Sequence, residues 1–282
     1  PTMTDKSLQS VLVENRTFPP PDGFARNAYP DAAELARLHE HAARDPEGFW
    51  AEQARSALVW HKPFTRTLDA SEAPNYRWFT DGQLNVSWEC LDVQLEQRRH
   101  DTALIFEAEG GAVRRLTYGE LHAEVCRFGN ALRALGVQQG DRVIIYMPLV
   151  PEAIIAMHAC ARIGAIHSVV FGGFSALSLR DRIEDAGARF VITADGGYRG
   201  GKVVELKSAT DKALSEGAAT VEKVIVLKHT ALEVPMHAGR DLWWHDAVKG
   251  RSAQCEPAWV DAEHPLFLLY TSGSTGKPKG IQ

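Results

Sequence analysis

The stretch RVIIYMPLVPEAIIAMHACARIGAIHSVVF, residues 142–171, contains a strand, a helix and a second strand in succession. Its first and last runs, residues 142–148 and 165–171, are apolar without a polar face. Strands of this kind are covered on both faces. Between the two runs, Pro151 suits the first turn of a helix and Gly164 suits its end. The stretch therefore predicts two parallel strands joined by a helix.

The same alternation continues downstream and begins upstream. A helix is predicted over 175–187, a strand over 189–195, a helix over 202–217 and a strand over 222–228. Upstream, residues 102–118 read as a hairpin, and a capping box at Thr117 and Glu120 opens a helix that Gly136 ends. The expected fold class is α/β: a doubly wound, mostly parallel sheet with flanking helices. Ligands bind such sheets beyond the carboxyl ends of the strands.

The first 95 residues have a different pattern. Residues 1–30 look loop-like, residues 31–60 predict two helices, and residues 60–85 are aromatic-rich and irregular. We therefore divide the chain into a helical and irregular extension, residues 1–95, packing on a main domain, residues 96–282.

Composition limits the classes of partner and the compartment. The chain has 282 residues, 45% of them hydrophobic, and a formal net charge of −5. This charge argues against a nucleic-acid or membrane surface, because both usually carry a basic excess. No apolar run approaches the ~20 residues of a membrane span, and the polar first ten residues predict no signal peptide. We expect a cytoplasmic location; the sequence gives no indication of oligomeric state.

Neither cysteines nor histidines suggest a metal or catalytic site. The four cysteines lie far apart without a CxxC pair, so we expect reduced, structural thiols. The eleven histidines show no HxxxH spacing. We predict no metal ligands.

The loop YTSGSTGKPKG, residues 270–280, follows residues 265–270, which we predict to be a buried strand. Its glycines permit close approach to a ligand, and its hydroxyls and lysines are donors for phosphate oxygens. A flexible surface turn is the alternative. A Walker A loop does not fit, because Gly273 and Gly276 are too close together and Pro278 stands in place of the Mg²⁺-binding hydroxyl.

Two further glycine-rich segments follow predicted strands. FGGFS, residues 171–175, places Gly172 and Gly173 before a helix that Ser175 caps, which suits an anion. TADGGYRGGK, residues 193–202, adds Arg199 and Lys202. Taken singly, these segments are better explained by a tight turn and a solvated pair of cations.

The loop of residues 270–280, called the phosphate-type loop below, closely resembles the signature loop of the adenylate-forming superfamily. The resemblance implies that this loop binds the β- and γ-phosphates of ATP while a carboxylate attacks the α-phosphate. The residues so implied are Thr271, Ser272, Gly273, Ser274, Thr275, Gly276, Lys277 and Lys279.

Residues 159–195 and the extension are similar to the AMP-forming acetyl-CoA synthetases, and the resemblance covers roughly residues 30–282. It implies that the nucleotide end of coenzyme A is bound by Gly172, Gly173, Arg199, Gly200, Gly201 and Lys202. Some members of that family carry arginine at the position of Lys202. Lysine keeps the charge but loses the bidentate fork.

The resemblance implies a ligase that uses acetate, ATP with Mg²⁺, and coenzyme A, and a chain more than twice as long as this one. The present sequence is then an amino-terminal part, inactive alone. The acyl pocket and the catalytic lysine would lie beyond Gln282, so we assign no catalytic residue. A propionyl-CoA synthetase and a non-catalytic module for coenzyme A or nucleotide remain alternatives.

Overall fold

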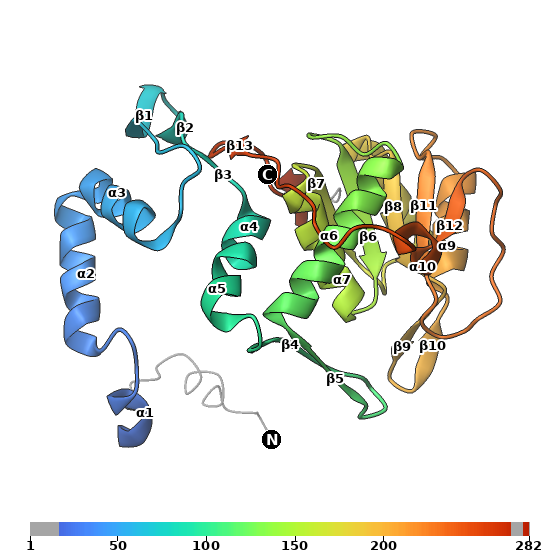
Figure 1. Cartoon of the computed structure of the whole chain (residues 1–282), viewed down its shortest axis with the longest axis horizontal. Coiled ribbons are helices and arrows are strands. Elements are labelled where there is room, and N and C mark those ends of the chain that lie inside the picture. The colour runs from blue at the N-terminus through green and yellow to red at the C-terminus, as the bar shows by residue number, and fades with distance from the viewer. Residues whose placement is uncertain (1–16, 272–278, 282) are drawn as a thin grey trace, which may run out of the picture. The chain divides into compact units, whose positions relative to one another are not determined.

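A five-stranded parallel sheet forms the core of the part of the chain that follows residue 54, in a computed structural model that describes residues 17–271 and 279–281 (Figure 1). In spatial order its strands are β7 (Ile166–Phe171), β6 (Arg142–Met147), β8 (Phe190–Ala194), β11 (Lys223–Leu227) and β12 (Asp241–Trp243). Every neighbouring pair is parallel. The predicted parallel sheet is confirmed.

Helices cover both faces of this sheet, which confirms the doubly wound α/β class. Successive side chains of β6 face opposite sides: Val143 and Ile145 belong to one apolar core, and Ile144 and Tyr146 to the other. The helices of the first core are α6 (Tyr118–Ala134), α7 (Pro151–Arg162) and α10 (Trp244–Val248). Those of the second are α8 (Ala176–Ala186) and α9 (Leu206–Ser215).

The strand order creates a switch point beside β6. The chain leaves β6 for β7 on one side, then crosses to β8 on the other side. Loops that leave the carboxyl ends of β6 and β8 therefore diverge, and such a divergence opens a crevice at the sheet edge.

Short-range signals begin and end the helices as predicted. Thr117 and Glu120 form the capping box of α6, and Gly136 follows that helix with a φ of 92°. Pro151 occupies the first turn of α7. The Ser175 hydroxyl accepts a hydrogen bond from the amide of Ser178 at the start of α8.

Several short elements precede the sheet in the second unit of the chain. The predicted hairpin over 102–118 is confirmed as β4 (Thr102–Glu107) and β5 (Val113–Thr117). The segment 60–85, expected to be irregular, contains an antiparallel hairpin, β1 (Arg66–Glu72) and β2 (Asn75–Thr80). Its turn at residues 73–74 includes Pro74, and its polar and aromatic mixture hid the strand pattern. The remaining elements are β3 (Gln83–Leu84), which pairs with β13 (Val260–Asp261), α4 (Val86–Cys90), a 3₁₀ turn η2 (Asp92–Gln94) and α5 (Leu95–Arg98).

The helix predicted over 202–217 begins later than expected. Residues 197–204 form a β-hairpin instead, β9 (Gly197–Arg199) and β10 (Lys202–Val204), and α9 starts at Leu206. Gly200 and Gly201 have φ values of 59° and 73°, which suit the two-residue turn of a hairpin. We call this element the glycine hairpin.

The prediction that residues 265–270 form a buried strand is wrong. Only Leu269–Thr271 form a strand, β14, which pairs with β15 (Lys279–Ile281). Upstream, Phe267 makes a single parallel bridge to His167 of β7. No described strand covers the outer side of this segment, so Phe267 and Leu269 are 44% and 51% exposed.

The structure divides into two compact units, one ending at Ala54 and the other beginning at Arg55. Described helices near the amino terminus are α1 (Asp22–Arg26), α2 (Ala32–Arg44) and α3 (Pro46–Ala57). The last two confirm the helices predicted over 31–60, whereas α1 lies where we expected only loop. The boundary at residue 95 stays a prediction.

Candidate ligand pocket and phosphate loop

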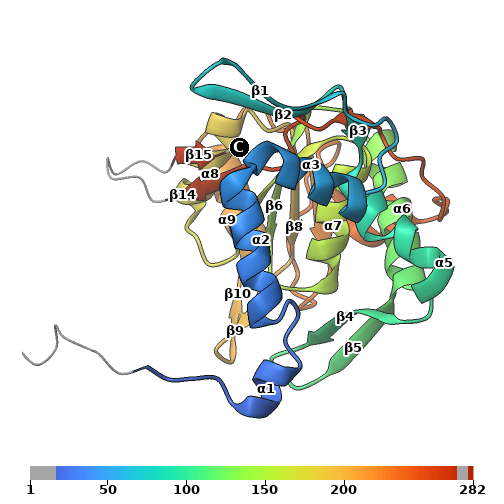
Figure 2. The ribbon, with the colours of Figure 1, turned by 90° about the vertical axis from the view of Figure 1, so that its left-hand side faces the viewer.

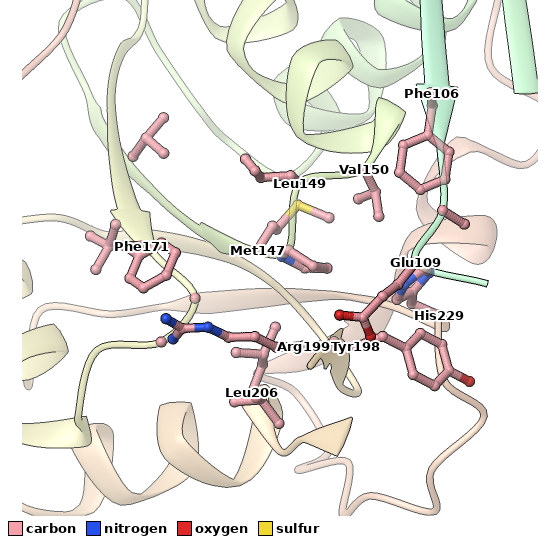
Figure 3. Close-up of a pocket in the computed structure, with 18 of the residues that line it drawn as sticks. Phe106, Glu109, Met147, Leu149, Val150, Phe171, Tyr198, Arg199, Leu206 and His229 are labelled. Carbon is pink, nitrogen blue, oxygen red and sulfur yellow. The ribbon is translucent and has the colours of Figure 1, made fainter. Parts of the chain in front are cut away.

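A cavity of about 550 Å³ lies at the carboxyl ends of β6, β7 and β8 (Figure 3). Its walls are mainly apolar and include Met147 and Leu149 after β6, Phe171 at the end of β7, and Leu206 at the start of α9. The cavity occupies the position that the switch point predicts. Its size and lining are those of a site for a small organic ligand.

Three of the residues predicted to bind coenzyme A meet at this cavity. Gly172, Gly173 and Arg199 all line it, and the guanidinium carbon of Arg199 lies 4.9 Å from the centre of the Phe171 ring. A Cβ atom on Gly173 would collide with the Arg199 guanidinium and would lie 2.6 Å from the Phe171 ring. Glycine at 173 thus allows the guanidinium to approach the main chain of the loop closely.

The other three predicted residues lie outside the cavity lining. Gly200 and Gly201 form the tip of the glycine hairpin, where their amides donate hydrogen bonds to the Glu109 carboxylate at 2.5 and 3.1 Å. Lys202 is exposed and pairs with Arg199 across the hairpin. These amides can hold an anion, as their contact with Glu109 shows, but their carboxylate partner comes from the hairpin β4–β5.

Sequence reasoning missed several residues at the cavity. Glu109, Tyr198 and His229 line it, and the Tyr198 and His229 rings pack edge to face with centres 5.6 Å apart (Figure 3). Tyr198 stood in the glycine-rich segment that we had singled out. Glu109 and His229 follow other strands, and only the fold brings them here.

Asp195 organises the loops on one side of the cavity. Its side chain is fully buried and accepts hydrogen bonds from the amides of Gly196, His229, Thr230 and Leu232, at 2.7–3.1 Å. Because these amides belong to the loops after β8 and β11, one carboxylate links the start of the glycine hairpin to the His229 loop. Its signal in the sequence was an acidic residue directly after a buried strand.

The phosphate-type loop connects two antiparallel strands. Thr271 ends β14 and lies opposite Lys279, which begins β15. A Walker A loop leads from a strand into a helix, so this arrangement is a further argument against that motif. Leu269 of β14 lines the cavity, which places the loop's first residue two positions from the cavity wall. The intervening predicted residues lie outside the described part of the chain: Ser272, Gly273, Ser274, Thr275, Gly276 and Lys277.

One group of metal-type ligands occurs within residues 17–271 and 279–281: Asp211, His237 and Asp241. The buried Lys207 ammonium lies 2.6 Å from Asp211 and 2.8 Å from Asp241. Arg240 also pairs with both carboxylates. These protein cations already compensate the acidic charge, so the cluster is a structural ion-pair network.

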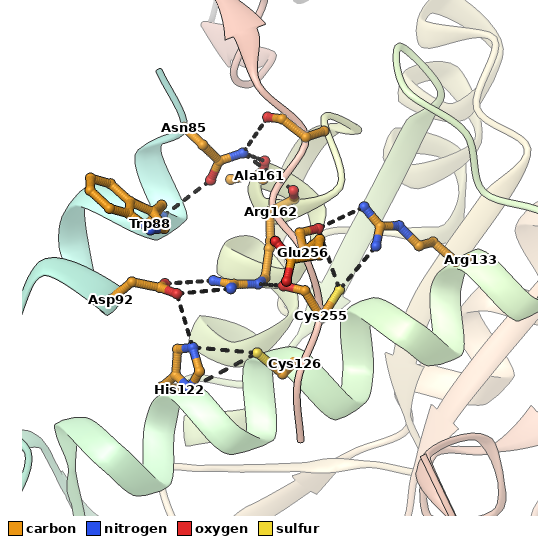
Figure 4. A network of polar contacts seen from close by, with 11 residues as sticks. Asn85, Trp88, Asp92, His122, Cys126, Arg133, Ala161, Arg162, Cys255 and Glu256 are labelled. Atoms are coloured by element: carbon orange, nitrogen blue, oxygen red, sulfur yellow. Dashed lines mark hydrogen bonds and ion pairs between the residues drawn. The ribbon is translucent and has the colours of Figure 1, made fainter. Parts of the chain in front are cut away.

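A second polar cluster lies in the core between α6, α7 and the 3₁₀ turn (Figure 4). The Nε2 atom of His122 lies 3.1 Å from Asp92 and 3.5 Å from the sulfur of Cys126. A catalytic Cys–His–Asp arrangement uses opposite ring nitrogens for the thiol and the carboxylate. Here Nε2 is the nitrogen nearer to both groups, with Nδ1 4.0 Å from the sulfur, and Cys126 is fully buried, so the cluster is structural.

The charges in this cluster support each other. Burial raises the pKa of Asp92, but hydrogen bonds from Arg162 and His122 outweigh it and hold that pKa at about 2. The hydrogen bond to Asp92, and then that to Cys126, raise the pKa of His122 to about 9. Elsewhere, burial alone raises the pKa of the Cys160 thiol to about 12, as expected for an inert structural cysteine.

The chain was compared with known families and proteins. The family model "AMP-binding enzyme" matches residues 91–282, and the model "Acetyl-coenzyme A synthetase N-terminus" matches residues 35–90. Acetyl-coenzyme A synthetases of Thiobacillus denitrificans and Nitrosomonas europaea are 58% and 55% identical over 98% of this chain. The chain spans 42% of the length of each.

A solved structure gives the same result for the fold. An acetoacetyl-CoA synthetase from Streptomyces lividans matches 92% of this chain and 40% of its own, with a TM-score of 0.81 and 29% identity. None of the described helices is long and apolar enough to span a bilayer. A doubly wound sheet and a cavity at its switch point, with Leu269 of β14 in the cavity wall, accompany these matches. The chain belongs to the family of AMP-binding enzymes.

Proposed function

We propose that this chain forms the amino-terminal part of an AMP-forming acetate–CoA ligase. In the first half-reaction an acetate oxygen attacks the α-phosphorus of ATP, pyrophosphate leaves, and acetyl-AMP forms. In the second, the thiol of coenzyme A loses its proton and attacks the acetyl carbonyl, and AMP leaves. The similarity to acetyl-coenzyme A synthetases over 98% of the chain supports this choice of reaction. We also propose a cytoplasmic location, because the four cysteines are free thiols, as expected in a reducing compartment.

The observation that carries the proposal is the position of Leu269. It lines the cavity, and two residues later Thr271 begins the phosphate-type loop. A strand that contacts the cavity thus leads directly into residues suited to polyphosphate. We propose that residues 271–277 and Lys279 hold the β- and γ-phosphates of ATP through backbone amides, hydroxyls and ammonium groups.

For coenzyme A we propose the cavity itself. Its apolar wall suits an adenine ring, and Arg199 offers a cation for a phosphate. Gly172 and Gly173 let the ligand approach the backbone closely. Gly200, Gly201 and Lys202 would join the site at its rim, where an anionic ligand would compete with Glu109 for the hairpin amides.

Magnesium enters the proposal as the partner of the phosphates of ATP. It would neutralise the charge that develops on the leaving pyrophosphate. The Asp211 cluster is a poor candidate for this ion, because Lys207 and Arg240 already pair with its carboxylates.

The deciding experiment is acid-dependent exchange of pyrophosphate into ATP by the full-length protein, with acetate, propionate and acetoacetate as alternatives. We expect the fastest exchange with acetate. One methylene changes binding by about 1–3 kcal/mol, so faster exchange with propionate would identify a propionyl-CoA synthetase instead. Absence of exchange with all three acids would overturn the ligase assignment.

Calorimetry with coenzyme A on the present chain tests the pocket separately. Arg199→Gln should weaken binding about tenfold or more, because it removes a charge-assisted contact to phosphate. Arg133→Gln is a control cation away from the cavity, where the arginine donates to the main-chain oxygen of Glu256. Equal binding by the Arg199 variant and the unaltered chain would contradict the proposed pocket.

A further inference from the structure

Helix α8 lies beside two segments that the proposed function uses. Its first residue follows the 171–175 loop, and β14 lies beside the same helix (Figure 2). The Tyr270 hydroxyl of β14 donates a hydrogen bond to Asp185, in the last turn of α8, at 2.7 Å. One helix therefore contacts both a wall of the cavity and the strand that leads into the phosphate loop.

Arg182, in the middle of α8, touches both segments. Its guanidinium carbon lies 4.7 Å from the centre of the Phe174 ring and 5.4 Å from that of Tyr270. Phe174 belongs to the 171–175 loop, and Tyr270 belongs to β14. Both distances are within the range of favourable cation–π contacts, so a single charged group contacts aromatic rings from both segments.

The charge of Arg182 has unusual surroundings. The side chain is only 7% exposed, and burial lowers its pKa. In the described part of the chain, its one hydrogen bond goes to the main-chain oxygen of Ser178, at 2.7 Å. The adjacent Asp181 pairs instead with Arg180, at 2.9 Å. A buried cation without a carboxylate partner is costly, and the contacts with the two rings offset part of that cost.

Each of the two aromatic residues also makes a hydrogen bond with another part of the fold. The Tyr146 hydroxyl of β6 donates to the main-chain oxygen of Phe174 at 2.7 Å, and Asp185 holds Tyr270. Neither segment can shift far without breaking one of these bonds or uncovering the guanidinium. A residue that served only to fill the core would need no charge here. A leucine would fill this space without the free-energy cost of burying a charge.

We propose that Arg182 is a positioning residue that sets the separation between the 171–175 loop and β14. It is not among the residues that line the cavity. Through Phe174 it orients the loop that carries Gly172 and Gly173, and through Tyr270 it orients the strand that ends at Thr271. Resting on the proposed function, this assignment makes coenzyme A binding and ATP binding depend on the same side chain.

The kinetic test uses Arg182→Gln, Arg182→Lys and the control Arg180→Gln in the full-length enzyme. Arg182→Gln should raise KM for both ATP and coenzyme A about tenfold, the size of one or two lost cation–π contacts. Arg182→Lys should recover part of both, because it keeps the charge but not the planar stacking. Arg180→Gln should leave both constants within about twofold. A change in only one KM, or in neither, would overturn the proposal.

Amide hydrogen exchange provides a readout that does not depend on activity. In Arg182→Gln the amides of Phe174, Leu269 and Thr271 should all exchange faster than in the unaltered protein, while core amides of β8 keep their protection. Faster exchange in only one segment, or general loss of protection, would refute a positioning role. If the unaltered enzyme showed no acid-dependent exchange of pyrophosphate, the proposed function would fail, and hydrogen exchange would still decide the role of Arg182.

Discussion

Arg162 donates two hydrogen bonds to Asp92, with nitrogen–oxygen distances of 2.7 and 2.9 Å (Figure 4). The arginine ends α7 and is 3% exposed, whereas the aspartate begins the 3₁₀ turn 70 residues earlier. The same guanidinium donates to the main-chain oxygen of Cys255. One ion pair thus joins three distant segments of the second unit. Its loss should lower the free energy of unfolding.

Asp92→Asn should lower the free energy of unfolding by about 3 kcal/mol, because it leaves the buried Arg162 without a compensating charge. Chemical denaturation of the variant and the unaltered protein measures the difference. The matched control is Asp101→Asn, which breaks the surface pair with Arg98 at 3.2 Å and should cost less than about 1 kcal/mol. Equal losses in the two variants would contradict the buried pair's role.

The raised pKa of His122 predicts a lower free energy of unfolding at alkaline pH. Its pKa is about 9 in the folded protein, above the 6.5 of an unperturbed histidine, so folding favours the protonated ring. The stabilisation is complete below pH 6.5 and disappears as pH rises through 9. Among the described residues, Asp92 and Cys126 are the titratable groups that contact the His122 ring, and Arg162 pairs with Asp92.

His122→Gln should remove this dependence. The gap in unfolding free energy between the unaltered protein and the variant should shrink by about 1–2 kcal/mol from pH 6 to pH 9.5. Urea unfolding at several pH values measures this gap. Burial lowers the pKa of His158 and His167, but their effect on stability is the same in both proteins and cancels in the comparison. A gap that stays constant with pH would show that His122 does not fold in its protonated form.

Asp195→Asn should loosen both loops that share this carboxylate. The amide group would place an N–H donor against backbone N–H groups, and an unsatisfied buried donor costs about 1–3 kcal/mol. We expect that loss in thermal or chemical unfolding, with faster amide exchange at Gly196 and Thr230. Asp246→Asn, at a side chain that is 59% exposed, is the control. Unchanged exchange at Gly196 and Thr230 would argue against a shared anchor.

Alanine at the two cavity glycines should separate binding from stability. On Gly173 the new methyl group meets the mobile end of Arg199 and the Phe171 ring, whereas on Gly172 it lies 3.0 Å from the main-chain oxygen of Met147. We expect Gly173→Ala to weaken coenzyme A binding several-fold by displacing Arg199, with little loss of stability. Gly172→Ala should mainly destabilise the fold, by about 1 kcal/mol or more. Calorimetry and chemical denaturation of both variants measure the two effects. A stability loss in Gly173→Ala with unchanged binding would contradict the prediction.

The elements of the central sheet could be predicted because their signals are local. Apolar runs such as residues 189–195, the capping box at Thr117 and the proline at 151 depend only on near neighbours in the chain. The site could be predicted in part. Gly172, Gly173 and Arg199 line the cavity, whereas Gly200, Gly201 and Lys202 lie outside its lining.

The failures share a physical cause. Residues 265–270 are apolar enough for a buried strand, but only their pairing partners decide burial, and here Phe267 bridges β7 at a sheet edge. The glycine hairpin replaced the start of a predicted helix because strand pairing and the positive φ of Gly200 and Gly201 prevailed over helix propensity.

By itself, then, the sequence determined the alternation of strands and helices, where most of them end, and the chemistry of the loops at the carboxyl edge. Only the tertiary structure decided the order of the strands, the contact of Gly173 with Arg199, the Asp195 anchor and the place of Arg182 between two rings. The physical reason is the separation of the interacting residues along the sequence. Caps and apolar runs act over one or two turns, whereas these contacts join residues that meet only after the sheet has assembled.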